Sequence, residues 1–326
     1  QWAAHESNLV PYLSRFNFIL KIQHSNLIIH KIIKLINNKY YKTLSLWVSM
    51  MIDRGSIVFM TQEIYNNTIK YLFLKNTHSV TYLPNFSFGE IEYNEQIILT
   101  KSNKINQELN LCWVGRIADF KIHILNYTIL KLSDYALKTE TRINFHIIGS
   151  GEYEKLLKLD FQNQYFKIIQ LGSFEKNKVD EYLEKNIDAM FSMGTSALDG
   201  ARIGLPVVLL DQSNVKVKEG YIFKFLFESK GFDLGHPITY LDYQLGNNSL
   251  EMIIKDLKLN YKILSKKTLD YYNENHSIES VSKKLLELIN GNTFYLFQEI
   301  SNSLLRQGLL RKFYLFYLKK IKKSYY

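Results

Sequence analysis

Short apolar runs alternate with longer stretches of helical spacing between residues 108 and 215. The runs have the length and the β-branched and aromatic content of buried strands. They comprise residues 109–114, 143–148, 167–171, 189–191 and 207–210. The stretches expected to be helices comprise residues 125–137, 153–159, 178–185 and a segment from Ser196. Repeated alternation of strand and helix predicts an α/β fold with a parallel sheet covered on both faces.

The segments on either side of this core are more helical. Ahead of it, the pattern predicts helix in residues 31–52 and from Gln62, with strands at 57–60 and 80–83. This order resembles the second half of another α/β domain, so we expect that domain to be incomplete. Residues 92–108 have low hydrophobicity and predict a linker.

After His236 the pattern predicts helices at 250–264 and 277–289 and from Phe294. The predicted organisation is a partial N-terminal Rossmann-like domain (1–107), a second Rossmann-like domain (108–290) and a basic amphipathic tail (291–326).

Glycine-bearing turns follow four of the predicted strands. They contain Gly115, Gly149 with Gly151, Gly172, and Gly194. Doubly wound sheets bind ligands at the carboxyl ends of their strands. We therefore expect the ligand site at this edge of the sheet.

Two cations follow the first of these turns. Arg116 comes directly after Gly115, and Lys121 lies five residues further on, where the next helix begins. A helix amino terminus offers unpaired N–H groups and a partial positive charge, so the added cations make a site suited to a diphosphate. The alternative is a solvated basic loop.

The turn after the fourth strand also opens a helix. The N–H groups of Gly194, Thr195, Ser196 and Ala197 would be free to bind phosphate oxygens. Ser196 and Asp199 have the spacing of a capping box, with Asp in place of the usual Glu or Gln. Simple helix capping is the alternative.

Composition narrows the classes of protein. The 326 residues carry 41 Lys and Arg against 31 Asp and Glu, a net charge of +10, which favours anionic partners. The single cysteine, Cys112, permits no internal disulfide and indicates a reducing compartment such as the cytosol. No apolar stretch approaches the roughly 20 residues of a membrane span. The first residue is Gln1 rather than Met, so we expect a piece of a longer chain.

Five motifs, in this order, resemble those of glycosyltransferases with the GT-B fold, most closely the retaining enzymes of family 4. They are Pro84-Asn85, Gly115-Arg116 with Lys121, Gly149-Ser150-Gly151, Leu171-Gly172, and the segment from Asp199 to Pro206. The resemblance covers about residues 55–290. It implies two Rossmann-like domains whose parallel sheets face each other across a cleft.

The resemblance also implies roles for single residues. Arg116 and Lys121 would bind the nucleotide diphosphate, and Asp199 falls on the carboxylate that holds the ribose. The family's first paired glutamate would fall near Phe191 and is missing, so backbone amides are expected to contact the sugar. The family's N-terminal domain contributes a histidine near the sugar; His5 is the candidate, and a surface histidine is the alternative.

The expected site is therefore defined residue by residue. We expect His5, Arg116 and Lys121 to be catalytic. The expected nucleotide-sugar-binding residues are Gly115, Arg116, Lys121, Gly149, Gly151, Gly172, Gly194, Thr195, Ser196, Ala197 and Asp199. We expect no metal and no cofactor apart from the nucleotide sugar donor, because no Asp-x-Asp occurs and one cysteine cannot form a thiolate site.

The last residues, 301–326, combine Lys and Arg with Leu, Phe and Tyr and contain no acid. Such a segment could lie on an anionic membrane surface, or could pack its apolar face on the protein body.

The function expected from all of this is transfer of a sugar from a nucleotide diphosphate donor to a hydroxyl acceptor, such as a cell-surface polysaccharide or a glycolipid. The enzyme would be retaining, metal-independent and cytoplasmic, either free or peripheral on the inner face of a membrane. The alternative is a catalytically degenerate GT-B-like protein that uses its basic surface to bind membrane or nucleic acid. Nucleic acid is not expected as a partner, because the cations are spread along the chain and no recognition module occurs.

Overall fold

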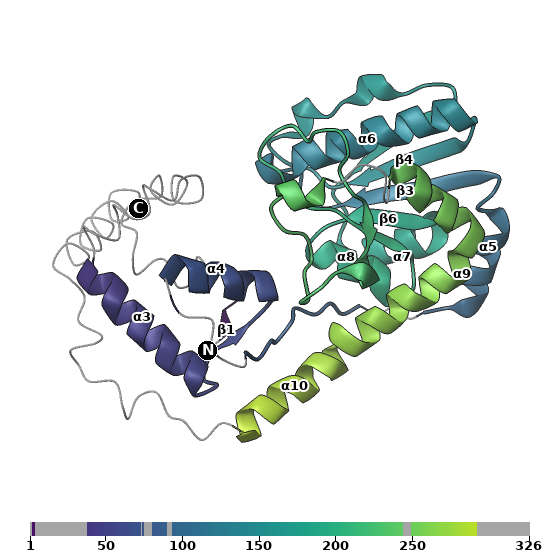
Figure 1. Cartoon of the computed structure of the whole chain (residues 1–326). Coiled ribbons are helices and arrows are strands. Elements are labelled where there is room, and N and C mark those ends of the chain that lie inside the picture. Colours follow the sequence, from purple (N-terminus) through teal and green to yellow (C-terminus); the bar gives the residue numbers. More distant parts are fainter. Residues whose placement is uncertain are drawn as a thin grey trace, which may run out of the picture. The chain divides into compact units, whose positions relative to one another are not determined.

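The computed structural model describes residues 2–3, 38–72, 74, 80–89, 93–243 and 249–291. The chain divides into two compact units, shown in Figure 1. The first unit contains Gln1–Leu83 and Lys284–Tyr326, and the second contains Pro84–Lys283.

The second unit is built on a mixed sheet with the strand order β5-β4-β3-β6-β7-β8. Its strands are β3 (Glu108–Val114), β4 (Arg142–Ile148), β5 (Phe166–Gly172), β6 (Ala189–Ser192), β7 (Val207–Leu209) and β8 (Lys224–Phe225). The first five are parallel, and β8 pairs antiparallel with β7 at the edge. The predicted α/β fold with a parallel-dominated sheet is confirmed, and the pattern missed only the short antiparallel strand.

Both faces of the sheet are buried, which explains why its strands are continuous apolar runs. In β3, Leu111 and Trp113 pack into one core cluster, whereas Cys112 and Val114 pack into a second. Side chains alternate across a strand, so the two clusters lie on opposite faces of the sheet.

The helices of this unit are α5 (Glu95–Lys104), α6 (Asp119–Thr139), α7 (Lys176–Asn186), α8 (Thr195–Arg202) and α9 (Leu250–Asn275). Helix α6 and the first half of α9 contribute apolar residues to the cluster that contains Trp113. Helices α7 and α8 contribute to the cluster that contains Cys112. Figure 1 shows these helices around the sheet.

Two local predictions are corrected by the structure. The stretch predicted as a linker contains α5, which is anchored by the buried Ile98 and Ile105 and by Lys101. The ammonium of Lys101 donates to the carbonyl oxygens of Leu183 and Ile187 at the end of α7. The helix predicted at 153–159 is instead two 3-10 turns, Glu154–Leu156 and Leu159–Phe161.

The first unit contains β1 (Trp2–Ala3), α3 (Asn38–Asp53), β2 (Val58–Phe59) and α4 (Gln62–Leu72). Its core includes Met51, Phe59 and Tyr65. The predicted strand at 80–83 makes only a bridge, between Tyr82 and Phe59. Helix α10 (Ile278–Gly291) follows α9 in the chain. His5 and residues 301–326 lie outside the described residues. No helix in the described ranges is long and apolar enough to cross a membrane.

Candidate functional site

The chain order of the strands marks one point at the carboxyl edge of the sheet. The chain adds β4 and β5 on one side of β3 and then crosses back to add β6 and β7 on the other. The loops after β3 and β6 therefore lead away in opposite directions, and such a switch point is where doubly wound sheets bind ligands. These two loops are the ones that carry Gly115-Arg116 and Gly194-Thr195-Ser196.

Side chains from the two loops meet at Gly115. A Cβ atom placed on Gly115 would lie 3.4 Å from the Lys121 Nζ atom and 3.6 Å from the Ser196 Oγ atom. Gly115 has a φ of +149°, a conformation that side chains rarely adopt. The structure therefore brings Lys121 of α6 and Ser196 of α8, two of the predicted binding residues, to one place.

Lys121 is a cation in a poorly solvated position. Its ammonium lies 5.8 Å from the centroid of the Trp113 ring and 5.6 Å from that of Phe120. Burial and the neighbouring Arg116 guanidinium both lower the pKa of Lys121. A half-buried cation beside a second, exposed cation is stabilised by an anion, so this corner is suited to a phosphate.

The glycines after β4 allow close approach of backbone to backbone. A Cβ atom on Gly149 would lie 2.1 Å from the Gly115 carbonyl oxygen, and one on Gly151 would lie 2.2 Å from that of Ile117. Hydrogen bonds join the same turns, from the Gly115 N–H to Ile148 at 3.0 Å and from the Gly149 N–H to Gly172 at 2.7 Å. These glycines therefore support the loop after β3 through close backbone packing, and their contact with the nucleotide sugar stays a prediction.

The turn before α8 differs from the prediction. The N-cap residue is Gly194, with no side-chain capping bond, so the capping box of Ser196 and Asp199 is wrong. The Gly194 N–H donates to the Leu234 carbonyl oxygen at 2.6 Å, and the Ala197 N–H donates to that of Gly194 at 3.1 Å. Two of the four predicted amides are thus engaged within the protein, which leaves those of Thr195 and Ser196 as the candidates for phosphate binding.

Asp199 is a member of an ionic network rather than a cap. Its carboxylate accepts hydrogen bonds from the Ser87 hydroxyl and the Lys176 ammonium, and its side chain is 14% exposed. The network continues from Lys176 to Asp180, at 3.7 Å, and from Asp180 to Arg202, at 2.7 Å. A nucleoside hydroxyl that reached Asp199 would have to share or replace these donors.

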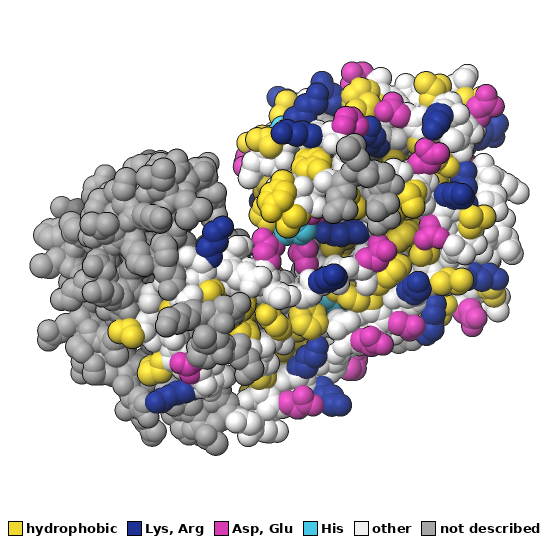
Figure 2. All heavy atoms as spheres, viewed as in Figure 1, with side chains coloured by type: hydrophobic (Ala, Val, Ile, Leu, Met, Phe, Trp, Pro, Cys, Tyr) yellow, Lys and Arg dark blue, Asp and Glu magenta, His cyan; other side chains and the backbone are white. Residues whose placement is uncertain are grey.

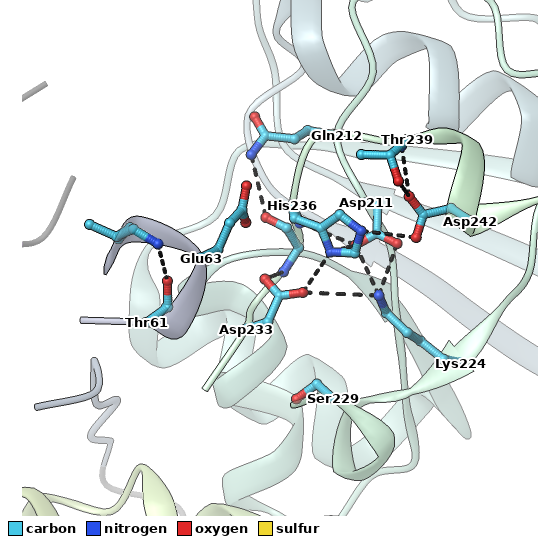
Figure 3. Close-up of polar contacts among 12 residues, drawn as sticks. Thr61, Glu63, Asp211, Gln212, Lys224, Ser229, Asp233, His236, Thr239 and Asp242 are labelled. Carbon is cyan, nitrogen blue, oxygen red and sulfur yellow. Dashed lines mark hydrogen bonds and ion pairs between the residues drawn. The ribbon is translucent and has the colours of Figure 1, made fainter. Parts of the chain in front are cut away.

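A second polar cluster lies after β7, and no motif in the sequence predicted it. We call Asp211, Lys224, Asp233, His236 and Asp242 the 211–242 cluster (Figure 3). Burial alone lowers the pKa of His236, but its hydrogen bonds to Asp233 and Asp242 raise it to about 10. Only Asp211 could have been noticed in the sequence, because it directly follows an apolar strand. The four other residues of the cluster come from loops and an edge strand.

Three residues of the 211–242 cluster are of types that bind metals, since ligand atoms of Asp211, His236 and Asp242 lie within 4.8 Å of one another. The Lys224 ammonium lies 3.0 Å from the Asp211 carboxylate, and both His236 ring nitrogens face carboxylate oxygens. A protonated histidine cannot ligate a metal, so these contacts favour an ionic network.

The charges of the second unit are mixed on the face seen in Figure 2. Lys and Arg side chains alternate there with Asp and Glu rather than forming one basic patch. The net positive charge of the chain is therefore not focused on this face, and the two cations of the loop after β3 act locally.

The chain is similar to several solved structures at low sequence identity. A variant of S. aureus TarM in complex with fondaparinux, α-GlcNAc-glycerol and UDP is 14% identical over 74% of this chain and 46% of its own, with a TM-score of 0.45. WaaG, a glycosyltransferase involved in lipopolysaccharide biosynthesis, is 16% identical over 72% of this chain and 62% of its own, with a TM-score of 0.45. A glycosyltransferase from Rickettsia africae is 12% identical over 78% of this chain and 67% of its own, with a TM-score of 0.49.

This chain thus spans 46% of the TarM chain and 62% of the WaaG chain. No protein-family model and no curated protein sequence matches it.

Proposed function

We propose that this protein is a GT-B-type glycosyltransferase that binds a nucleotide diphosphate sugar at the loops after β3 and β6. One observation carries the proposal: the switch point of the sheet brings Lys121 and Ser196 together at Gly115. Cations, a hydroxyl and the first N–H groups of a helix at such an edge are the groups that bind a diphosphate.

The chemistry of transfer would be electrostatic. Negative charge grows on the leaving diphosphate as the glycosidic bond breaks. Arg116, Lys121 and the N–H groups of Thr195 and Ser196 would stabilise that charge, because they are held in place before the reaction begins. In this proposal the two cations neutralise the diphosphate without a metal, and Asp199 contacts the ribose. Retention of configuration is part of the proposal on the family resemblance alone.

The acceptor would be a hydroxyl of a glycan or of a glycolipid. We propose that His5 lies near the transferred sugar and that the basic residues 301–326 hold the enzyme at an anionic membrane surface. The tail would then bring the site close to a lipid-linked acceptor.

A donor screen tests the proposal. Thermal shift and hydrolysis are measured with UDP, GDP, ADP and CMP sugars, each with and without EDTA. We expect one nucleotide diphosphate sugar to raise the melting temperature and to be hydrolysed slowly, equally well with EDTA. Loss of activity with EDTA would contradict metal independence. Binding without hydrolysis or transfer would favour the degenerate binding protein, and no shift with any donor would exclude a nucleotide-sugar enzyme.

A further inference from the structure

The loop of residues 231–236 has an unusual backbone. Gly231, Phe232 and Gly235 have positive φ values of 64°, 62° and 107°. A residue with a bulky side chain, such as Phe232, rarely adopts this conformation. The surrounding contacts, rather than the local preferences of the chain, therefore determine the shape of the loop.

This loop lies directly against the turn that opens α8. The Leu234 carbonyl oxygen accepts the Gly194 N–H at 2.6 Å. A Cβ atom on Gly235 would lie 2.5 Å from the Leu210 carbonyl oxygen and 3.1 Å from the Met193 Cβ atom. The backbone of the loop thus touches the start of the candidate phosphate turn, at Met193 and Gly194, with no room for a side chain at Gly235.

His236 connects the loop to its surroundings from both edges of its ring, as Figure 3 shows. Its Nδ1 atom lies 2.7 Å from Asp233 and its Nε2 atom lies 2.9 Å from Asp242. Its backbone N–H donates at 3.1 Å to Asp211, whose side chain is 1% exposed. Asp211 is held in turn by Lys224 and by the Tyr221 hydroxyl, at 3.0 and 2.9 Å.

We propose that His236 is a positioning residue for the Gly194 turn, a role that rests on the proposed function. By bonding Asp233 and Asp242 it fixes the loop, and the loop fixes Gly194 through the Leu234 carbonyl oxygen. Occupation of the Gly194 N–H aims the next two N–H groups, those of Thr195 and Ser196, at the diphosphate. Fixed donors stabilise charge better than donors that must reorganise when the charge appears. His236 itself does not contact the substrate.

The test uses the whole chain and three variants. His236→Phe keeps a ring and removes both donors, His236→Gln restores one donor group, and Gly235→Ala disturbs the same backbone contact without changing any charge. The matched control is His146→Gln, because the ring of His146, on β4, is also hydrogen-bonded within the second unit: its Nδ1 atom lies 2.8 Å from the Tyr182 hydroxyl of α7.

Two quantities are measured for each protein. The first is hydrogen exchange of the Gly194 amide by NMR in the ligand-free protein, which reports on its bond to Leu234. The second is the affinity for the nucleoside diphosphate relative to the monophosphate. We expect His236→Phe and Gly235→Ala to speed Gly194 exchange and to lower this relative affinity by about tenfold. His236→Gln should recover part of the slow Gly194 exchange and part of the relative diphosphate affinity. His146→Gln should change neither the exchange nor the affinity.

Unchanged Gly194 exchange in both His236→Phe and Gly235→Ala would overturn the proposal, as would faster exchange with unchanged relative affinity. Gly235→Ala decides the question if His236→Phe does not fold. The proposed function is judged separately, with Arg116→Ala. If that variant loses diphosphate affinity while the His236 and Gly235 variants keep it, only the positioning role fails. If the unsubstituted protein binds no nucleoside diphosphate, both fail.

Discussion

Ser87 donates its hydroxyl to the carboxylate of Asp199, 112 residues further along the chain. Ser87 lies near the start of the second unit, and its carbonyl oxygen accepts the Tyr272 hydroxyl at 2.6 Å. The residue that resembles the ribose carboxylate thus also holds the segment through which the chain enters this unit. Asp199 therefore combines a structural contact, which the structure shows, with the ligand contact that we propose.

Asp199→Asn should affect both contacts. Asn keeps the shape of the side chain but loses the charge that pairs with Lys176, so the free energy of unfolding should fall by about 1–2 kcal/mol. The exposure of Lys176, 44% of its side chain, makes the ion pair the smaller part of this loss. Nucleoside binding should weaken as well, which calorimetric titration measures.

Ser87→Ala is the matched control. It removes the same hydrogen bond while leaving the Asp199 carboxylate in place, so it should reduce stability by about 1 kcal/mol and keep nucleoside affinity. Equal loss of affinity in both variants would show that Asp199 acts through the Ser87 segment and not on the ribose.

Lys121→Met should separate stability from ligand binding. Removing a half-buried cation beside Arg116 relieves desolvation and repulsion, so the melting temperature of the ligand-free protein should stay the same or rise. Diphosphate binding should weaken by about 1.5–3 kcal/mol, the range for a charge-assisted hydrogen bond. Arg116→Ala should weaken it similarly, and both variants should lose less affinity for the monophosphate.

Lys131→Met provides the comparison on the same helix. Lys131 is ion-paired with Glu219 and lies 5.4 Å from the centroid of the Tyr127 ring. Its loss should leave nucleotide affinity unchanged. Unaltered diphosphate affinity in both the Lys121 and the Arg116 variants would remove these residues from the site.

The sheet and its carboxyl-edge loops could be predicted because both faces of the sheet are buried. Burial on both faces makes strands such as β3 and β4 continuous apolar runs, and their turns require glycine. The sequence pattern did not predict the order of the strands, and it is this order that brings the loops of Gly115 and Gly194 together. Helix α5 was not predicted, because its composition is polar. It is held in place by the hydrogen bonds of Lys101 to the end of α7, which are long-range contacts that a local pattern does not contain.

The contacts of the site were harder to predict than its location. Gly194 is the N-cap residue of α8, and its N–H group donates to the carbonyl oxygen of Leu234, 40 residues further on. A local motif such as the capping box contains no information about so distant a partner. The 211–242 cluster is assembled from segments with no common spacing. Its members become recognisable only when the fold places them around His236.

Deletion of residues 313–326 tests the proposed membrane contact. This segment combines Lys319, Lys320, Lys322 and Lys323 with aromatic residues and no acid. The truncated protein should sediment less with vesicles containing anionic lipid and should still bind nucleotide. Binding of the whole chain to these vesicles should fall as the salt concentration rises. Salt screens the attraction between the lysines and the lipid headgroups over about 8 Å at physiological ionic strength. Unchanged sedimentation with a lower melting temperature would mean that the segment packs on the protein instead.

His236 makes the stability of the protein depend on pH on the alkaline side. Its pKa is about 10 in the folded protein and about 6.5 when unfolded, so the folded state binds the proton more tightly. The stabilisation is complete below about pH 6.5 and is lost as the pH rises towards 10, because the imidazolium then loses its charge beside Asp211, Asp233 and Asp242.

Denaturant unfolding between pH 6.5 and 10 should therefore show a steady loss of stability. The loss should be on the order of a few kcal/mol, since each pKa unit corresponds to about 1.4 kcal/mol. His236→Gln should unfold more easily at pH 6.5 and have a flatter pH profile, whereas His146→Gln should keep the slope of the unsubstituted protein. The same slope in all three proteins would mean that other groups, such as buried tyrosines, control the alkaline transition, and that His236 is not held as an imidazolium.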